Sequence, residues 1–168
     1  MNICINKINS VYTNKKTYQK TNINKDKKFN TEDIDYKKID DEEETIMHEL
    51  YDKSVMIHSA FTYEEFKKVD IFPPMNCPGI VRREWRNLFK NASERQRIEL
   101  LNFAGHCHQV LKETKMQLND IKDYLKLMEE VKKYFKINYY NPSGKDNEIY
   151  ESLMNINNNF EISLKQYI

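Results

Sequence analysis

Residues 121–135 read IKDYLKLMEEVKKYF, and the spacing of the apolar residues in this stretch decides the fold class. An α-helix has about 3.6 residues per turn, so apolar residues that recur every three or four positions share one face. Most of the other positions hold lysines and acids. The stretch predicts an amphipathic helix, capped by Asn119 or Asp120. Its buried face comprises Ile121, Tyr124, Leu125, Met128, Val131 and Phe135.

Two more amphipathic helices flank this one. Ser93-Glu-Arg-Gln96 has the form of a capping box, in which two side chains satisfy each other's backbone amides. The helix that it starts buries Leu100, Phe103, Ala104, Cys107, Leu111, Thr114 and Leu118. After a loop over 138–147, the last predicted helix buries Ile149, Leu153, Ile156, Phe160, Leu164 and Tyr167. Its run 157–159 is Asn-Asn-Asn, which has low helix propensity, so we expect this end to be weak.

Three more helical segments are predicted upstream. Cys77-Pro78-Gly79 opens one of them, because proline is tolerated in the first helical turn. Its apolar face holds Val81, Trp85, Leu88 and Ala92. The second covers 41–59, with Ile46, Met47, Leu50, Tyr51, Val55 and Met56 on its apolar face. The third starts at the capping box Thr62–Glu65 and ends before Phe72-Pro73-Pro74, since proline has no amide proton to donate.

Together these segments predict an all-α bundle of four or five helices over residues 42–168. No convincing strand pair is present, and three Gly and four Pro are few for a fold with many tight turns. A bundle buries each apolar stripe against another helix. The predicted core residues are Trp85, Leu88, Leu100, Phe103, Cys107, Leu111, Leu125, Met128, Phe135, Leu153 and Phe160.

Residues 1–41 differ in composition from the rest of the chain. Residues 1–28 hold seven Lys and one acid, whereas residues 29–44 hold eight acids and two Lys. The segment is rich in Asn and Lys and has few large apolar residues, so it cannot bury enough surface to offset its ordering entropy. We therefore expect residues 1–41 to be mostly disordered; a polyampholyte arm that binds a partner is the alternative.

Cysteine usage and hydropathy indicate a soluble protein of a reducing compartment. Cys4, Cys77 and Cys107 are too few and too unevenly spaced for a disulfide framework. No run approaches the roughly 20 apolar residues of a membrane span, and the first residues do not form a secretory signal. The 27 basic and 26 acidic residues give a net charge of +1, which disfavours a nucleic-acid binder.

The sequence does not predict an enzyme. It has no Gly-x-Ser-x-Gly elbow and no visible triad, and acidic pairs such as Glu64-Glu65 are adjacent rather than facing. We expect no cofactor. A small metal-binding or thiol-redox protein that uses Cys77, His106, Cys107 and His108 is the alternative function. Helix geometry disfavours the metal version, because consecutive residues point about 100° apart and do not converge on one ion.

A basic row is the strongest candidate for a partner-binding surface. Arg82, Arg86 and Lys90 are spaced at i, i+4 and i+8 on one helix face, and Arg83 lies beside them. Such a row attracts acidic protein or anionic lipid. The alternative is an ordinary solvated face that pairs with nearby acids such as Glu84, Glu94 and Glu99.

Residues 83–91, REWRNLFKN, followed by Glu94-Arg95 and a helix with Leu and Phe, resemble the PHIST family (Plasmodium helical interspersed subtelomeric, also called the PRESAN domain). The Asn-, Lys- and Ile-rich composition is similar to that of chains from AT-rich genomes such as malaria parasites. The recognisable part covers about 83–111. Trp85 is the only Trp, whereas the family usually has more.

This resemblance implies a non-enzymatic helical module that binds other proteins. Family members are typically exported to the host red cell, where they bind membrane-skeleton proteins or the acidic cytoplasmic tails of adhesins. In that reading Trp85 is a core residue, Glu94 and Arg95 begin the next helix, and the basic row steers acidic sequence. No clear export motif is present in the sequence.

Overall fold

The computed structural model describes residues 34–144 and 147–168, and within them it is all α-helix, as predicted. Five helices have twelve or more residues, and two are short. The helices are α1 (Tyr36–Lys53), α2 (Val55–Ala60), α3 (Tyr63–Phe66), α4 (Gly79–Lys90), α5 (Glu94–Thr114), α6 (Ile121–Asn138) and α7 (Glu148–Lys165). Of the segment 1–41 that was predicted to be mostly disordered, residues 1–33 lie outside the described residues, and residues from Tyr36 onward are helical.

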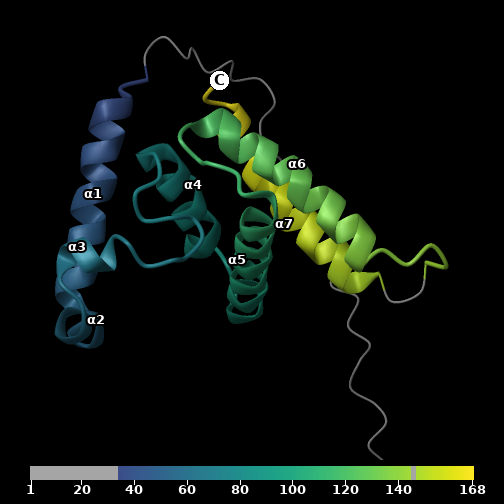
Figure 1. The fold of residues 1–168 in the computed structure, drawn as a ribbon, viewed down its shortest axis with the longest axis horizontal. Helices are drawn as coiled ribbons and strands as arrows, with labels where there is room; N and C mark the ends of the chain where they lie inside the picture. Colours follow the sequence, from purple (N-terminus) through teal and green to yellow (C-terminus); the bar gives the residue numbers. More distant parts are fainter. Residues whose placement is uncertain (1–33, 145–146) are drawn as a thin grey trace, which may run out of the picture.

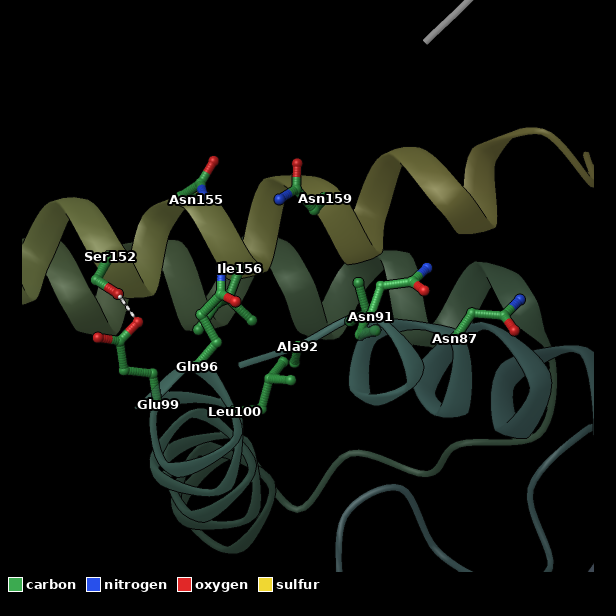
Figure 2. A pocket seen from close by; sticks show the side chains of 11 residues that line it. Asn87, Asn91, Ala92, Gln96, Glu99, Leu100, Ser152, Asn155, Ile156 and Asn159 are labelled. Carbon is green, nitrogen blue, oxygen red and sulfur yellow. Dashed lines mark hydrogen bonds between the residues drawn. The ribbon is translucent and has the colours of Figure 1, made fainter. Parts of the chain in front are cut away.

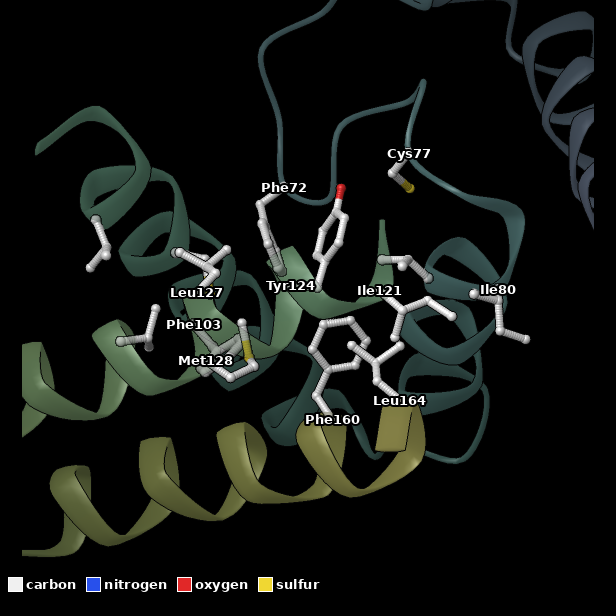
Figure 3. Packing of buried hydrophobic residues seen from close by; sticks show 14 of the residues in the cluster. Phe72, Cys77, Ile80, Phe103, Ile121, Tyr124, Leu127, Met128, Phe160 and Leu164 are labelled. Carbon is white, nitrogen blue, oxygen red and sulfur yellow. The ribbon is translucent and has the colours of Figure 1, made fainter. Parts of the chain in front are cut away.

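Helices α6 and α7 form the centre of the fold. They lie side by side with the chain reversing between them, and α5 and α4 pack on this pair (Figure 1). Figure 3 shows how Tyr124 and Met128 of α6 and Phe160 and Leu164 of α7 point into a shared interior, where each is fully buried. The predicted apolar stripes of α5, α6 and α7 therefore meet in one core, except at Thr114 and Ile149, which were predicted to be buried and are exposed.

The predicted core residues are all at least partly buried. Seven are buried: Leu100, Phe103, Cys107, Met128, Phe135, Leu153 and Phe160. Four are partly buried and pack against the others: Trp85, Leu88, Leu111 and Leu125. Trp85 lies against the rings of Phe72 and Phe160, with ring centroids 5.4 and 5.5 Å away.

The helix ends follow the local capping chemistry. Both predicted capping boxes are present, at Thr62 for α3 and at Ser93 for α5, and the side chain of Asp120 caps α6. Helix α5 ends at Thr114 because Lys115 takes a left-handed conformation with φ of 54°. Leu118, which was predicted on the α5 face, therefore lies in the connection to α6.

The last helix is continuous through residues 157–159, where weakness was expected. Asn157 is fully buried, and its side-chain amide donates to the backbone oxygen of Met128 at 3.1 Å. This bond satisfies the amide nitrogen, whereas Asn157 Oδ1 is buried with no hydrogen-bond partner among the described residues, so burial of the amide is only partly compensated. Tertiary packing therefore outweighs low helix propensity at this position.

The first predicted helix differs most from expectation. It begins at Tyr36, before the predicted boundary at 42, because the Asp35 side chain caps it and Ile39 packs into the core. It also breaks at Ser54, whose side chain caps α2. Three residues predicted on its apolar face are exposed: Leu50 at 58% before the break, and Val55 at 80% and Met56 at 82% after it.

Helices α1, α2 and α3, called the arm below, have a small core of their own. Met47, Tyr51 and Phe66 are buried together, separately from the main core. In Figure 1 the arm stands beside α4 on one side of the molecule, away from the α6–α7 pair. Outside the arm, the main neighbour of α1 is α4.

Candidate functional site

The predicted basic row is not a free ridge, because most of it pairs with α1. Arg82, Arg83 and Arg86, called the arginine row below, face three consecutive acids of α1, Glu42, Glu43 and Glu44, called the acidic triplet. The expected local partners Glu84, Glu94 and Glu99 do not neutralise the row. Glu84 instead accepts a hydrogen bond from the hydroxyl of Tyr167 at 2.9 Å.

Each arginine has a defined carboxylate partner. Arg82 Nη1 lies 3.2 Å from Glu44, and Arg83 Nη2 lies 2.7 Å from Glu42. Arg86 donates to both oxygens of Glu43, at 3.3 and 2.5 Å. Two parallel bonds of this kind are the strongest geometry for an arginine–carboxylate pair. The acidic triplet therefore occupies the arginine row in an ordered way.

Burial is uneven across these pairs. Glu43 is 3% exposed, whereas the side chains of Glu42 and Glu44 are 50% and 44% exposed. Ion pairs that water and salt can reach contribute little to stability, whereas a buried carboxylate that loses its partner is costly. We therefore expect Glu43 to contribute most to the stability of the contact, and Glu42 and Glu44, whose ion pairs water and salt can screen, to contribute less.

The N-terminus of α4 also rests on α1. The backbone amide of Gly79 donates to Asp40 Oδ1 at 2.5 Å, which caps a helix that has no side-chain cap from its own N-cap residue. A Cβ atom at position 79 would lie 2.6 Å from Asp40 Oδ1 and 2.7 Å from its Cα. Glycine at 79 therefore permits the close approach of α1 and α4.

The electrostatics of Glu44 reflect its partners. Burial raises the pKa of its carboxyl, but hydrogen bonds from the Tyr63 hydroxyl and from Arg82 outweigh burial and hold the pKa below its usual value. Burial and the same contact with Glu44 raise the pKa of Tyr63 to about 12. Glu44 therefore links α3 and α4 through α1 as a charged carboxylate.

Lys90, the last member of the predicted basic row, lies apart from these contacts. It is exposed at the end of α4, and it forms no ion pair with any residue that the structure describes. The four predicted partner-binding residues therefore divide into three that contact α1 and one that is solvated.

The cysteines and histidines of the alternative function do not gather. His106 contacts the Tyr139 hydroxyl at 3.2 Å, and His108 lies 3.3 Å from Asp70. Within 34–144 and 147–168, no group of three or more Cys, His, Asp or Glu side chains is arranged to hold a metal ion. The proposed set Cys77, His106, Cys107 and His108 is therefore not a ligand cluster.

Both described cysteines are buried thiols. Burial raises the pKa of Cys77 to about 12, although the nearby Arg82 and Tyr124 favour its thiolate, and burial also raises the pKa of Cys107. Figure 3 shows the Cys77 sulfur beside the hydroxyl end of Tyr124. A buried, protonated thiol is a poor nucleophile, so neither cysteine has the environment of a reactive one.

The structure reveals an open groove of about 300 Å³ that the sequence did not predict. It lies where the end of α4, the start of α5 and the middle of α7 come together (Figure 2). Its apolar part consists of Leu88, Ala92, Leu100 and Ile156. Its polar part consists of Asn87, Asn91, Gln96, Glu99, Ser152, Asn155 and Asn159.

The groove is polar at its edges and has one internal hydrogen bond. The Ser152 hydroxyl donates to Glu99 at 2.8 Å and ties α7 to α5 at one end. Asn87 and Asn91 are exposed on α4, and Asn155 and Asn159 are exposed on α7. No side-chain hydrogen bond joins these four amides to another described residue.

Sequence reasoning missed the groove because its residues lie far apart in the chain. The pairs 87/91 and 155/159 each have i, i+4 spacing, which places them on one face of their helix, but such polar pairs are common on solvated faces. No local pattern indicates that the two pairs flank the same apolar floor. Phe72, a core residue beside Trp85, was likewise hidden in a proline-rich connection.

No protein-family model, curated protein or solved structure matches this chain. The resemblance to the PHIST family therefore stays a prediction. Among the described residues, no helix combines the length and the apolar content needed to cross a membrane.

Proposed function

We propose that this chain is a non-enzymatic helical module that binds an extended segment of a partner protein in the groove between α4, α5 and α7. The supporting observation is the pairing of two amide rows around an apolar floor. Asn and Gln amides both donate and accept hydrogen bonds, which is what a peptide backbone requires from a binding site. The floor offers the partly buried Leu88 and Ile156 to apolar side chains of the partner.

The spacing of the amides suits an extended chain. Residues four apart on a helix are separated by about 6 Å along its axis. Every second residue of an extended chain is separated by roughly 6.6 Å, since the rise is about 3.3 Å per residue. Asn87 and Asn91, or Asn155 and Asn159, are therefore spaced to contact alternate peptide groups of one bound segment.

The cellular location and the partner of this module are proposed from the PHIST resemblance. It assigns the chain to the host red-cell cytoplasm or membrane skeleton, with a membrane-skeleton protein or an acidic adhesin tail as partner. The arginine row that would steer an acidic tail is occupied by α1 in this structure, so the groove is the more accessible of the two surfaces.

Selection from a displayed library of random linear peptides tests the groove. The full chain is compared with a variant that carries Asn91→Arg and Asn159→Arg, which place two long side chains at the groove edges. The matched control is Asn102→Arg, an exposed Asn of α5 that does not line the groove. We expect peptides to be enriched by the unchanged chain and by the control, and not by the groove variant.

Equal enrichment by all three folded proteins would contradict the groove as the binding site. The same three proteins, presented with an extract of red-cell membrane skeleton, test the finer placement separately. A defined component retained by the unchanged chain and by Asn102→Arg, and lost with the groove variant, would support the red-cell assignment. Peptide binding without any such component would support the module and contradict that assignment.

A further inference from the structure

The arm of this protein carries an acidic helix that already occupies a basic surface of the same chain. The acidic triplet of α1 pairs with Arg82, Arg83 and Arg86 of α4 over distances of 2.5 to 3.2 Å. We propose that α1 is an intramolecular ligand, and that the arginine row is a docking surface for an acidic helical segment of another protein, which competes with α1 for it.

The chemistry of the surface specifies its occupant. Three guanidinium groups at positions 82, 83 and 86 meet three consecutive carboxylates on one helix, so the row recognises a run of acids in helical conformation. Gly79 lets the backbone of the docked helix approach closely, and its own backbone amide donates to a carboxylate of that helix. An acidic helix with a carboxylate two residues before a Glu-Glu-Glu run, as Asp40 stands before Glu42, reproduces every one of these contacts.

The attachment of α1 suits displacement. Tyr51 and Met47 of α1 pack within the arm, so this cluster does not depend on the main core. Two of the three carboxylates are about half exposed, and exposed ion pairs are screened by salt. Ile39 and a hydrogen bond from the Tyr36 hydroxyl to the backbone oxygen of Tyr167 anchor the first turn of α1. The remainder of α1 contacts α4 through the acidic triplet, Asp40 and the sulfur of Met47, which lies 3.6 Å from Arg82, so carboxylates make most of these contacts.

Competition in cis reduces the affinity for a partner. A binding surface that is free in only a small fraction of molecules shows an apparent affinity lowered by that fraction. Weakening α1 without touching the arginines should therefore strengthen binding of an acidic helix. This inference rests on the proposed function as an interaction module, but it concerns a different surface from the groove.

The test uses the full chain and a fluorescent synthetic peptide of residues 35–53, which is α1 itself, at low ionic strength. The release variant carries Glu42→Gln, Glu43→Gln and Glu44→Gln. The matched control carries Glu49→Gln, Asp52→Asn and Glu64→Gln, three acids of the arm that pair locally rather than with α4. We expect the release variant to bind the peptide about tenfold more tightly than the unchanged chain or the control.

Two results would overturn the proposal. One is equal peptide binding by the release variant and the control. The other is a gain that persists when Arg82, Arg83 and Arg86 are also changed to Gln, because binding would then use another surface. The groove variant Asn91→Arg with Asn159→Arg should bind the peptide like the unchanged chain, so failure here and failure of the proposed function are distinguishable.

A measurement on the unchanged chain keeps the proposal testable if the release variant does not fold. Amide hydrogen exchange of α1 is followed from low to high salt. We expect exchange of residues 42–53 to accelerate with salt while that of α6 and α7 stays constant. Exchange in α1 that does not respond to salt would contradict displacement of the acidic helix.

Discussion

The α6–α7 pair and the α1–α4 pair are both contacts between two long helices, but they are held by different chemistry. Phe135, Met128 and Phe160 are fully buried between or beside α6 and α7. The side chain of Asn157 also donates a hydrogen bond from α7 to the Met128 backbone oxygen of α6. Helix α1 meets α4 through carboxylates and guanidinium groups. Salt does not screen apolar contacts, whereas it weakens ion pairs, so we expect the α1–α4 contact to be the more sensitive of the two to ionic strength.

Truncating the apolar contact should have the largest effect. Phe160→Ala removes a fully buried ring that packs against Trp85 and Phe72. Deletions of this kind cost about 3–5 kcal/mol, because the cavity collapses only partly. Urea unfolding of the variant should show this loss at every salt concentration. The exposed Ile162 of the same helix offers the control, since Ile162→Ala should cost less than about 0.5 kcal/mol.

Breaking the centre of the charged contact should cost less. Glu43→Gln keeps the shape but leaves Arg83 and Arg86 without their buried carboxylate. We expect a loss of about 2 kcal/mol, in the range for hydrogen bonds to charged groups. Glu49→Gln, which removes only an exposed pair with Lys53, should stay within about 0.5 kcal/mol. Equal effects of the two variants would show that burial of Glu43 does not matter.

Two glycine-to-alanine substitutions compare a crowded position, Gly79 between α1 and α4, with an open one, Gly105 in α5. Gly79→Ala should destabilise the chain by about 1–2 kcal/mol, because its Cβ meets the backbone of Asp40. Gly105→Ala, inside α5 with no atom near the new Cβ, should stabilise it by about 0.5–1 kcal/mol. Thermal unfolding should therefore shift in opposite directions. A shared direction would contradict the close packing of α1 on α4.

The smallest effect concerns pH. The pKa of Glu44 lies below its ordinary value of 4.5 in the folded chain, because contacts with Tyr63 and Arg82 outweigh burial. Its stabilisation is therefore complete above about 4.5 and is lost as the pH falls through the lower folded value. The unfolding temperatures of the unchanged chain and Glu44→Gln should differ slightly at neutral pH and converge in acid. A difference that is constant with pH would contradict a charged Glu44.

The sequence predicted the apolar contact better than the charged one for a physical reason. The residues of an apolar stripe are close together in the sequence of one helix, so most buried positions of α6 could be inferred from their spacing alone. The arginine row was visible too, but its partners are about forty residues earlier in the chain. The acidic triplet lies at the start of the helix predicted over 41–59, and no local pattern pairs it with the arginine row. Only the fold brings the two together.

The groove was beyond sequence reasoning for the same reason. Asn87 and Asn159 line the same groove only because α4 and α7 lie close together in the fold. No local sequence pattern distinguishes them from other exposed asparagines. The break at Ser54 was missed because the apolar pattern continues across it into Val55 and Met56. Ser54 ends α1, and its side chain caps α2. Because no described residue buries Val55 and Met56, their apolar side chains do not hold the two helices in one line, and the cap decides where the helix ends.

The amide of Asn157 has a consequence for how α7 is aligned along α6. Apolar contacts have no preferred direction, so they specify the alignment of two helices less strictly than a hydrogen bond does. The bond to the Met128 oxygen exists at one alignment only. A shift of one turn, about 5.4 Å, would leave the amide nitrogen of Asn157 buried without an acceptor, which is energetically costly. A single asparagine thus sets the register of the central pair, as buried asparagines do in coiled coils.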